Sequence, residues 1–85
     1  MGIIVGMTED RRVTNEILHM KIRLFRLACK QWGKSIDDCA GIFEKYKIDS
    51  YIEDLYEIMH VQGDEANLME IEEYLEAQGA TDDIK

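Results

Sequence analysis

The chain has 85 residues, of which 46% are hydrophobic and 33% are charged, so the composition excludes a disordered tail and favours one globular domain with a modest core. It carries 18 Asp and Glu against 10 Lys and Arg, which gives a formal net charge of −8. This acidic balance argues against nucleic-acid binding, because affinity for phosphates comes from Lys and Arg that displace counterions. With no run of 18 apolar residues and no signal-peptide core, we expect a cytoplasmic protein without a membrane span.

The charge is distributed unevenly along the chain. Residues 1–34 hold seven Lys and Arg against three Asp and Glu, whereas residues 35–85 hold three against fifteen. The first part is therefore +4 and the second −12. We expect the basic strip of the first helix to face acidic residues of its own chain or of a partner.

The first predicted helix is unusually apolar. We expect residues 1–7 to be frayed or strand-like, a helix start at Thr8 or Thr14, and a helix end at Gly33. Between Ile17 and Trp32 the apolar residues form two adjoining stripes that cover roughly 220° of the helix circumference, far more than the usual stripe of about 100°. Such a helix needs neighbours on at least two sides.

Two further helices follow from capping and spacing. Ser35, with Asp38 three residues later, resembles a capping box. Its helix would place on one face Ile36, Cys39, Ala40, Phe43 and Tyr46. A third helix begins at Asp49 or Ser50 and ends at Gly63, and its predicted inward residues are Tyr51, Ile52, Leu55, Ile58 and Met59.

A fourth, short helix is predicted from Asn67, which forms a capping box with Glu70, to Gly79. Its inward residues would be Leu68, Ile71, Tyr74 and Leu75. The predicted fold is therefore all-α, a compact bundle of about four short helices around an apolar central first helix. Residues 1–12 would be a tail or helix lead-in, residues 13–79 a single domain, and residues 80–85 a disordered tail.

Part of the chain resembles a known family. The pattern runs Tyr51-Ile52-x3-Tyr56-x3-His60-x-Gln62-Gly63, and it continues with Ile71 and a closing Tyr74-Leu75. It resembles a small bacterial domain family of unknown function, with members of about 70 residues, and the likeness covers residues 15–77. No established activity follows from the resemblance. What it implies is a partnership with a second small protein, such as an antitoxin-like role.

His60 is the best single candidate for chemistry. It falls near the end of the third predicted helix, at i+4 from Tyr56, so a ring contact or a hydrogen bond to the hydroxyl is available. His60 has either a structural role, in packing or in capping the helix end, or a functional role, as a base or in partner recognition. Asp64 or Glu57 could orient the imidazole, but no nucleophile pattern accompanies them. The candidate contact residues are His60, Tyr56, Tyr51, Gln62 and Gly63.

The two cysteines allow further hypotheses about function. Cys29 and Cys39 lie five residues on either side of Lys34 and could meet across a helical hairpin, as a redox pair or with His19 or His60 at zinc. The pattern favours two buried hydrophobic cysteines instead, because zinc sites use close local pairs that this sequence lacks. No phosphate loop or serine-nucleophile motif is present. We therefore predict no cofactor and no metal.

Three functions remain open from the sequence. The first is a non-enzymatic protein-interaction module, either a homodimer or the small subunit of a two-protein, antitoxin-like system, because the core is thin and the first helix has spare apolar surface. The second is a small-ligand binder or minor enzyme that uses His60. The third is an acidic mimic of nucleic acid, which requires the carboxylates of residues 53–76 to share one surface.

Overall fold

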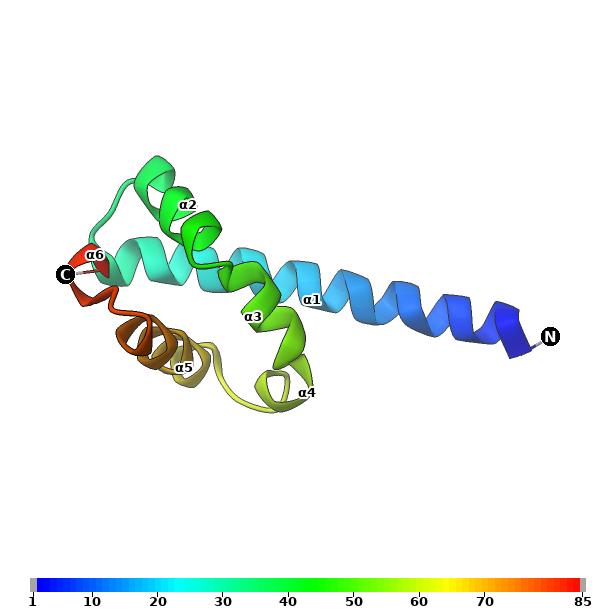
Figure 1. Ribbon diagram of the computed structural model, residues 1–85. Coiled ribbons are helices and arrows are strands. Elements are labelled where there is room, and N and C mark those ends of the chain that lie inside the picture. Colours follow the sequence, from blue (N-terminus) through cyan, green and yellow to red (C-terminus); the bar gives the residue numbers. More distant parts are fainter. Residues whose placement is uncertain (1, 85) are drawn as a thin grey trace.

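Helix α1 (Gly2–Trp32) is the longest element of the protein, and the other helices gather around its C-terminal part (Figure 1). The computed structural model describes the backbone of residues 2–84 and the side chains of residues 13–84. Within these limits the chain contains no strand and forms five further helices, namely α2 (Ile36–Lys45), α3 (Ile48–Asp54), α4 (Tyr56–Met59), α5 (Asp64–Ala77) and α6 (Thr81–Ile84). The all-α prediction is confirmed, whereas the arrangement differs from four helices.

Helix α1 starts earlier than predicted and ends where predicted. Its backbone is helical from Gly2, so residues 2–7 are not strand-like and neither Thr8 nor Thr14 begins the helix. The physical reason is cooperativity, because extending an existing helix by one residue requires far less free energy than nucleating a new helix. In addition, no proline interrupts the sequence. At the other end, Gly33 has φ +63°, the left-handed conformation that glycine adopts without strain.

Helix α2 begins as predicted and α3 does not. The Ser35 Oγ accepts a hydrogen bond of 3.1 Å from the Asp38 amide, which is the expected N-terminal cap. The next turn is made by Lys47, whose φ of 53° is unusual for a residue with a side chain. Helix α3 therefore starts at Ile48, and no local side chain caps it.

The third predicted helix is broken at Leu55 into α3 and α4. Leu55 has φ −103° and ψ 10°, which is away from the helical region, and the chain changes course there. One consequence is that Ile58, predicted to point inward, is 56% exposed, whereas Ile52 and Met59 are buried.

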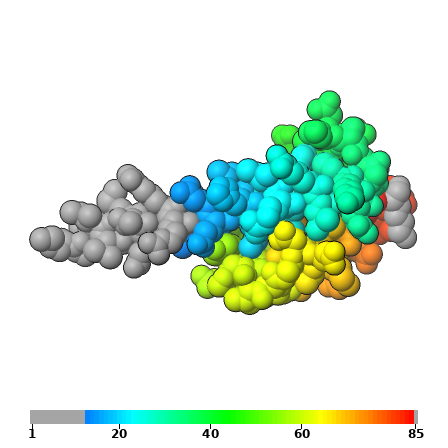
Figure 2. All heavy atoms as spheres, turned by 180° about the vertical axis from the view of Figure 1, so that it is seen from behind, coloured from blue at the N-terminus to red at the C-terminus, as the bar shows by residue number. Residues whose placement is uncertain are grey.

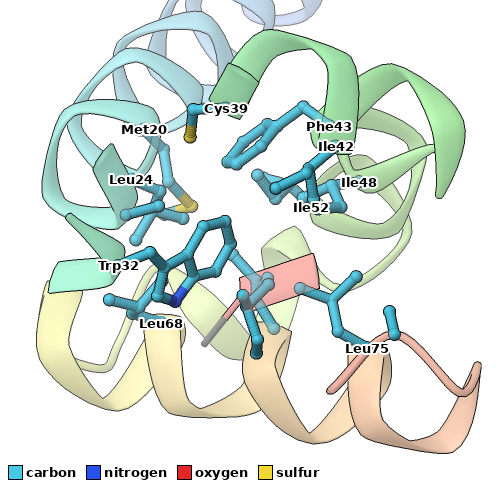
Figure 3. Packing of buried hydrophobic residues seen from close by; sticks show 14 of the residues in the cluster. Met20, Leu24, Trp32, Cys39, Ile42, Phe43, Ile48, Ile52, Leu68 and Leu75 are labelled. Carbon is cyan, nitrogen blue, oxygen red and sulfur yellow. The ribbon is translucent and has the colours of Figure 1, made fainter. Parts of the chain in front are cut away.

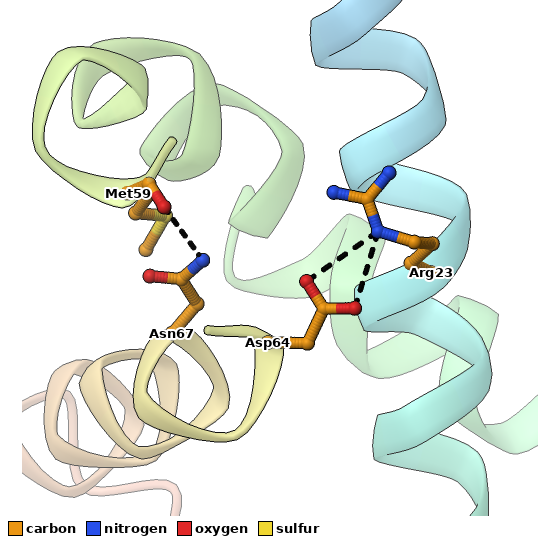
Figure 4. Close-up of polar contacts among 4 residues, drawn as sticks. All are labelled: Arg23, Met59, Asp64 and Asn67. Carbon is orange, nitrogen blue, oxygen red and sulfur yellow. Dashed lines mark hydrogen bonds and ion pairs between the residues drawn. The ribbon is translucent and has the colours of Figure 1, made fainter. Parts of the chain in front are cut away.

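Asn67 shows why the fourth helix was misplaced. Helix α5 begins at Asp64 after Gly63, and Asn67 lies inside it rather than capping it. The Asn67 side chain is fully buried and its Nδ2 donates a hydrogen bond of 2.9 Å to the Met59 carbonyl at the end of α4 (Figure 4). The same carbonyl also accepts a hydrogen bond of 3.1 Å from the Gln62 amide, so Asn67 adds a second donor and ties α5 to the end of α4.

The core lies between α1 and the remaining helices (Figure 3). The residues of α1 that are buried in it are Met20, Leu24, Ala28 and Trp32. In the second predicted stripe, to which Trp32 belongs, Phe25 and Cys29 pack against the core, whereas Leu18 and Ile22 are exposed. The buried hydrophobic residues are Met20, Leu24, Ala28, Trp32, Cys39, Ile42, Phe43, Ile48, Ile52, Tyr56, Met59, Leu68, Ile71, Leu75, Ala80 and Ile84. Ile36, which was predicted to be inward, is 70% exposed. None of the described helices is long and apolar enough to cross a membrane.

The predicted disordered tail is wrong, because residues 81–84 form α6. Ala80 and Ile84 are buried in the core. The Asp83 carboxylate accepts a hydrogen bond from the Tyr46 hydroxyl and pairs with Lys45 Nζ at 3.5 Å. These contacts anchor α6 to the end of α2, and they could not be expected from the composition of residues 80–85.

The buried stripe of α1 can be tested by a pair of substitutions. Leu24→Ala should lower the free energy of unfolding by about 2–5 kcal/mol, because it leaves a cavity in the core. Ile36→Ala should change that free energy by less than about 0.5 kcal/mol, because Ile36 is exposed. Urea unfolding followed by circular dichroism measures both, and similar losses would contradict the assigned core.

Docking of α6 should depend on pH through Asp83. The Tyr46 hydrogen bond, and to a lesser extent Lys45, lowers the pKa of Asp83 below its ordinary value of 3.8. The stability that this carboxylate contributes should therefore be present above the ordinary pKa and disappear as the pH falls through the lowered pKa. Asp83→Asn should destabilise the protein at neutral pH, with a difference from wild type that vanishes in acid.

Asp82→Asn is the matched control, because Asp82 is an exposed neighbour in the same helix. Urea unfolding at several pH values compares the two variants. Equal effects of the two substitutions, or an Asp83→Asn effect that persists in strong acid, would contradict the proposed contact.

Candidate functional site

A mostly apolar groove runs along the face of α1 that the other helices leave uncovered. Seen from behind, residues of α1 form a broad open surface between α2 and the later helices (Figure 2). The groove has a volume of about 650 Å³. Its apolar lining consists of Leu18, Ile22, Phe25, Cys29, Ile36 and Phe43, and its charged lining of Lys21, Arg26, Lys30, Lys34 and Asp49.

The helical repeat explains why these α1 residues line up. Leu18, Ile22, Phe25 and Cys29 are spaced by four, three and four residues, so they form one ridge along the helix. The Phe25 ring meets Phe43 of α2 edge-to-face, with centroids 5.1 Å apart, and closes the floor. Further out, Leu18 is 52% and Ile22 43% exposed. The ridge is therefore anchored at one end and open to solvent at the other.

The cations around the groove are only partly neutralised. Lys21 forms an ion pair with Glu53. Lys34 lies close enough to Asp83 to help lower the pKa of that carboxyl. Arg26 and Lys30 are exposed and form no ion pair with any described side chain. The rim thus presents positive charge on a protein whose net charge is negative.

The predicted contact between Tyr56 and His60 is present, in a second and smaller cleft. Their rings stack with centroids 5.2 Å apart, and the cleft of about 330 Å³ is lined by Glu16, His19, Met20, Arg23, Tyr56 and His60. The Tyr56 hydroxyl donates a hydrogen bond to Glu16, which raises the pKa of that hydroxyl because the carboxylate favours the protonated form. Sequence reasoning missed Glu16 and Arg23, since both lie on α1, more than 30 residues before Tyr56.

The arrangement around His60 offers little for catalysis. Asp64, predicted as a group that could orient the imidazole, instead accepts from Arg23 Nε at 3.1 Å (Figure 4). Glu57 is exposed, and no hydrogen bond joins its carboxylate to His60 in the described part of the chain. A general base needs a positioned partner or a substrate proton within reach, and among the described side chains the imidazole contact is the stacking on Tyr56.

The other residues of the sequence pattern have separate positions. Tyr51 stacks on Tyr74, with ring centroids 4.2 Å apart, and its hydroxyl reaches the Glu70 carbonyl at 3.4 Å. Gln62 donates to the Ile58 carbonyl at 3.4 Å, and Gly63 precedes α5 as its N-cap. The structure therefore brings together only Tyr56 and His60 of the five candidate residues.

The two cysteines are neighbours, as the hairpin argument predicted. Cys39 is buried and Cys29 half-buried. Burial, together with a hydrogen bond to Cys29, raises the pKa of Cys39 to about 12. A thiol with so high a pKa is protonated at neutral pH and reacts slowly, because the thiolate is the nucleophile. No cluster of three or more His, Cys, Asp or Glu that could hold a metal ion occurs among the described residues.

Comparison with known protein families identifies the family of the chain. A family described as "Protein of unknown function (DUF3791)" matches residues 16–78. The chain belongs to this family. The match confirms the resemblance to a small domain family of unknown function, while the Tyr–His–Gln-Gly pattern remains a prediction. No curated protein and no solved structure matches the chain significantly.

The DUF3791 match spans the groove face of α1 and the His60 cleft, and it leaves α6 outside. It begins at Glu16, the residue that binds the Tyr56 hydroxyl. All the residues that line the two candidate sites of this DUF3791 domain therefore lie within the matched segment.

The contact between α1 and α4 can be tested through the pKa of Tyr56. Glu16→Gln should lower that pKa toward the ordinary value of 10.0, because the hydrogen bond to a carboxylate is the largest cause of the shift. Glu57→Gln is the control, since Glu57 contributes less. Alkaline titration by tyrosine absorbance, with Tyr56→Phe to assign the transition, measures the change. Equal shifts in the two variants would contradict the contact.

Proposed function

We propose that this DUF3791 protein is a non-enzymatic protein-interaction module, the small subunit of a two-protein, antitoxin-like system, and that its partner binds in the groove on α1. One observation carries the proposal, namely the apolar groove of about 650 Å³ on the uncovered face of α1. Binding sites for proteins are recognised by such contiguous apolar surface with a polar rim.

The exposure of the groove residues supports a partner. Leu18 and Ile22 are about half exposed, and Ile36 is 70% exposed at the start of α2. Each would gain roughly 25 cal/mol for every Å² of apolar surface that a partner removed from water. The adjoining buried stripe already supplies the core, so folding alone does not require these side chains to be apolar.

The charge of the rim favours a different protein over a second copy. A twofold dimer formed by the groove would place the same surface patch of each copy against the other. Such a dimer would bring Arg26 and Lys30 of both copies into one interface. Like charges in contact are unfavourable, so a homodimer through this face is the weaker alternative.

Affinity capture from the native host tests the proposal. Wild type should retain a stoichiometric partner, and Leu18→Ser with Ile22→Ser should lose it, because the double substitution removes apolar groove surface. The matched control is Ile58→Ser with Val61→Ser, since Ile58 and Val61 are also exposed but do not line the groove. Mass spectrometry quantifies the captured partner. Loss in the control alone, or equal retention in both variants, would contradict the proposal.

Binding of a small ligand at His60 is the second candidate, supported by the cleft that contains His60 and His19 beside Arg23. Its volume of about 330 Å³ is near the lower end for small-molecule sites, which run from about 300 to 1,000 Å³. Nucleic-acid mimicry gains no support, because Glu53, Asp64 and Glu72 each bind a different residue of α1 instead of sharing an open surface.

A further inference from the structure

We propose that the groove on α1 receives an acidic amphipathic helix of the partner, an inference that rests on the proposed function and adds the chemistry of the occupant. The apolar ridge defines the shape of that occupant, and the unpaired cations define its charge. Both properties belong to the same face of the protein.

The dimensions of the ridge fit a helix. From Leu18 to Cys29 the ridge covers about 16 Å at 1.5 Å per residue, which matches about three turns of a second helix. Ile36 and Phe43 of α2 form the other wall, so the occupant would lie in a channel between two helices. Apolar side chains at i, i+4 and i+7 of the occupant would pack beside the ridge. Pairing with a strand is excluded for the described chain, which offers no sheet edge.

The rim favours an acidic occupant. Four basic side chains line the groove against one carboxylate, that of Asp49. Arg26 and Lys30 carry no acidic partner in the part of the chain whose side chains are described. The net charge of −8 does not prevent this attraction, because charges beyond about 8–10 Å are screened at physiological salt. Only the local rim acts strongly on a docked segment.

The acidic helix of a second copy, α5, does not supply such an occupant. Its acidic helix α5 carries Asp64, Glu65 and further carboxylates, but its apolar residues Leu68, Ile71 and Leu75 are buried in its own core. Only Met69 of α5 is a large apolar side chain exposed to solvent. One apolar residue cannot fill a groove with a ridge of four, so the occupant belongs to another protein.

The test uses two stapled helical peptides of about 16 residues and the full-length protein. Both peptides carry Leu at every third or fourth position, and the remaining positions are mainly Glu in one and Lys in the other. Fluorescence anisotropy measures the Kd of each at low and high salt. We expect the Glu peptide to bind at least tenfold more tightly than the Lys peptide, and its affinity to fall at high salt, because screening weakens exposed charge pairs.

Rim variants locate the interaction. Arg26→Gln with Lys30→Gln should weaken binding of the Glu peptide roughly tenfold, as expected for two exposed charge pairs. Gln31→Glu with Gln78→Glu changes the net charge by the same amount at exposed positions outside the groove, and should leave the Kd within about twofold. Circular dichroism verifies that all variants fold. Equal weakening by both pairs, or equal affinity for the two peptides, would overturn the proposal.

Two further measurements separate this inference from the proposed function. If the native partner is captured through Leu18 and Ile22 but the Glu peptide does not bind, the acidic helix is wrong and the interaction module stands. If capture is also independent of those residues, both fail. A sizing column adds a third outcome, since an oligomer that dissociates in Leu18→Ser with Ile22→Ser would make the second copy the occupant and overturn the inference.

Discussion

The burial of a single stripe of α1 is the constraint on which the rest of this structure depends. Leu24 and Ala28 are fully buried, and Trp32 closes the stripe with its Nε1 donating a hydrogen bond of 2.9 Å to Glu72 of α5. Helices α2, α3 and α5 all contact α1. In a domain of 85 residues the area available for burial is small, so one stripe must serve all of the neighbouring helices. The second apolar stripe is covered only in part, by the contact of Phe25 with Phe43 of α2, and its exposed remainder lines the groove.

The charged residues of α1 also differ between the flanks of the buried stripe and the groove. On the flanks of the buried stripe, Lys21 pairs with Glu53 and Arg23 with Asp64, so part of the basic strip faces the acidic part of its own chain as the charge pattern predicted. Exposed pairs of this kind contribute little stability, and their main effect is to orient α3 and α5 against α1. On the groove side, Arg26 and Lys30 have no such partners among the described side chains, and their charge remains available to a ligand.

The two candidate sites lie on different faces of α1 and differ in kind. The His60 cleft is polar and its main groups already satisfy one another, because Glu16 binds Tyr56 and Arg23 binds Asp64. The groove is apolar, larger and framed by unpaired charge. Because the polar groups of the cleft already bind one another, fewer of them are free to act on a substrate. Exposed apolar surface, in contrast, is stabilised when a partner covers it.

The sequence by itself determined the helical class, the end of α1 at Gly33, the Ser35 cap, the burial of the apolar residues Leu68, Ile71 and Leu75 in α5 and the contact of Tyr56 with His60. All of these depend on spacing within a few residues, where the geometry of a helix leaves little choice. It also indicated that α1 has more apolar surface than a small core can use.

Only the tertiary structure decided which stripe of α1 is buried, where α5 begins and how α6 is held. Asn67 reads locally as a helix cap, yet it is buried inside α5, where its Nδ2 donates a hydrogen bond to the Met59 carbonyl of α4. Residues 81–84 read as a polar tail, yet Ile84 enters the core and Asp83 meets Tyr46. Ile36 reads as an inward residue, yet it borders the groove. These outcomes depend on contacts between residues far apart in the chain, and periodicity within one helix carries no information about them.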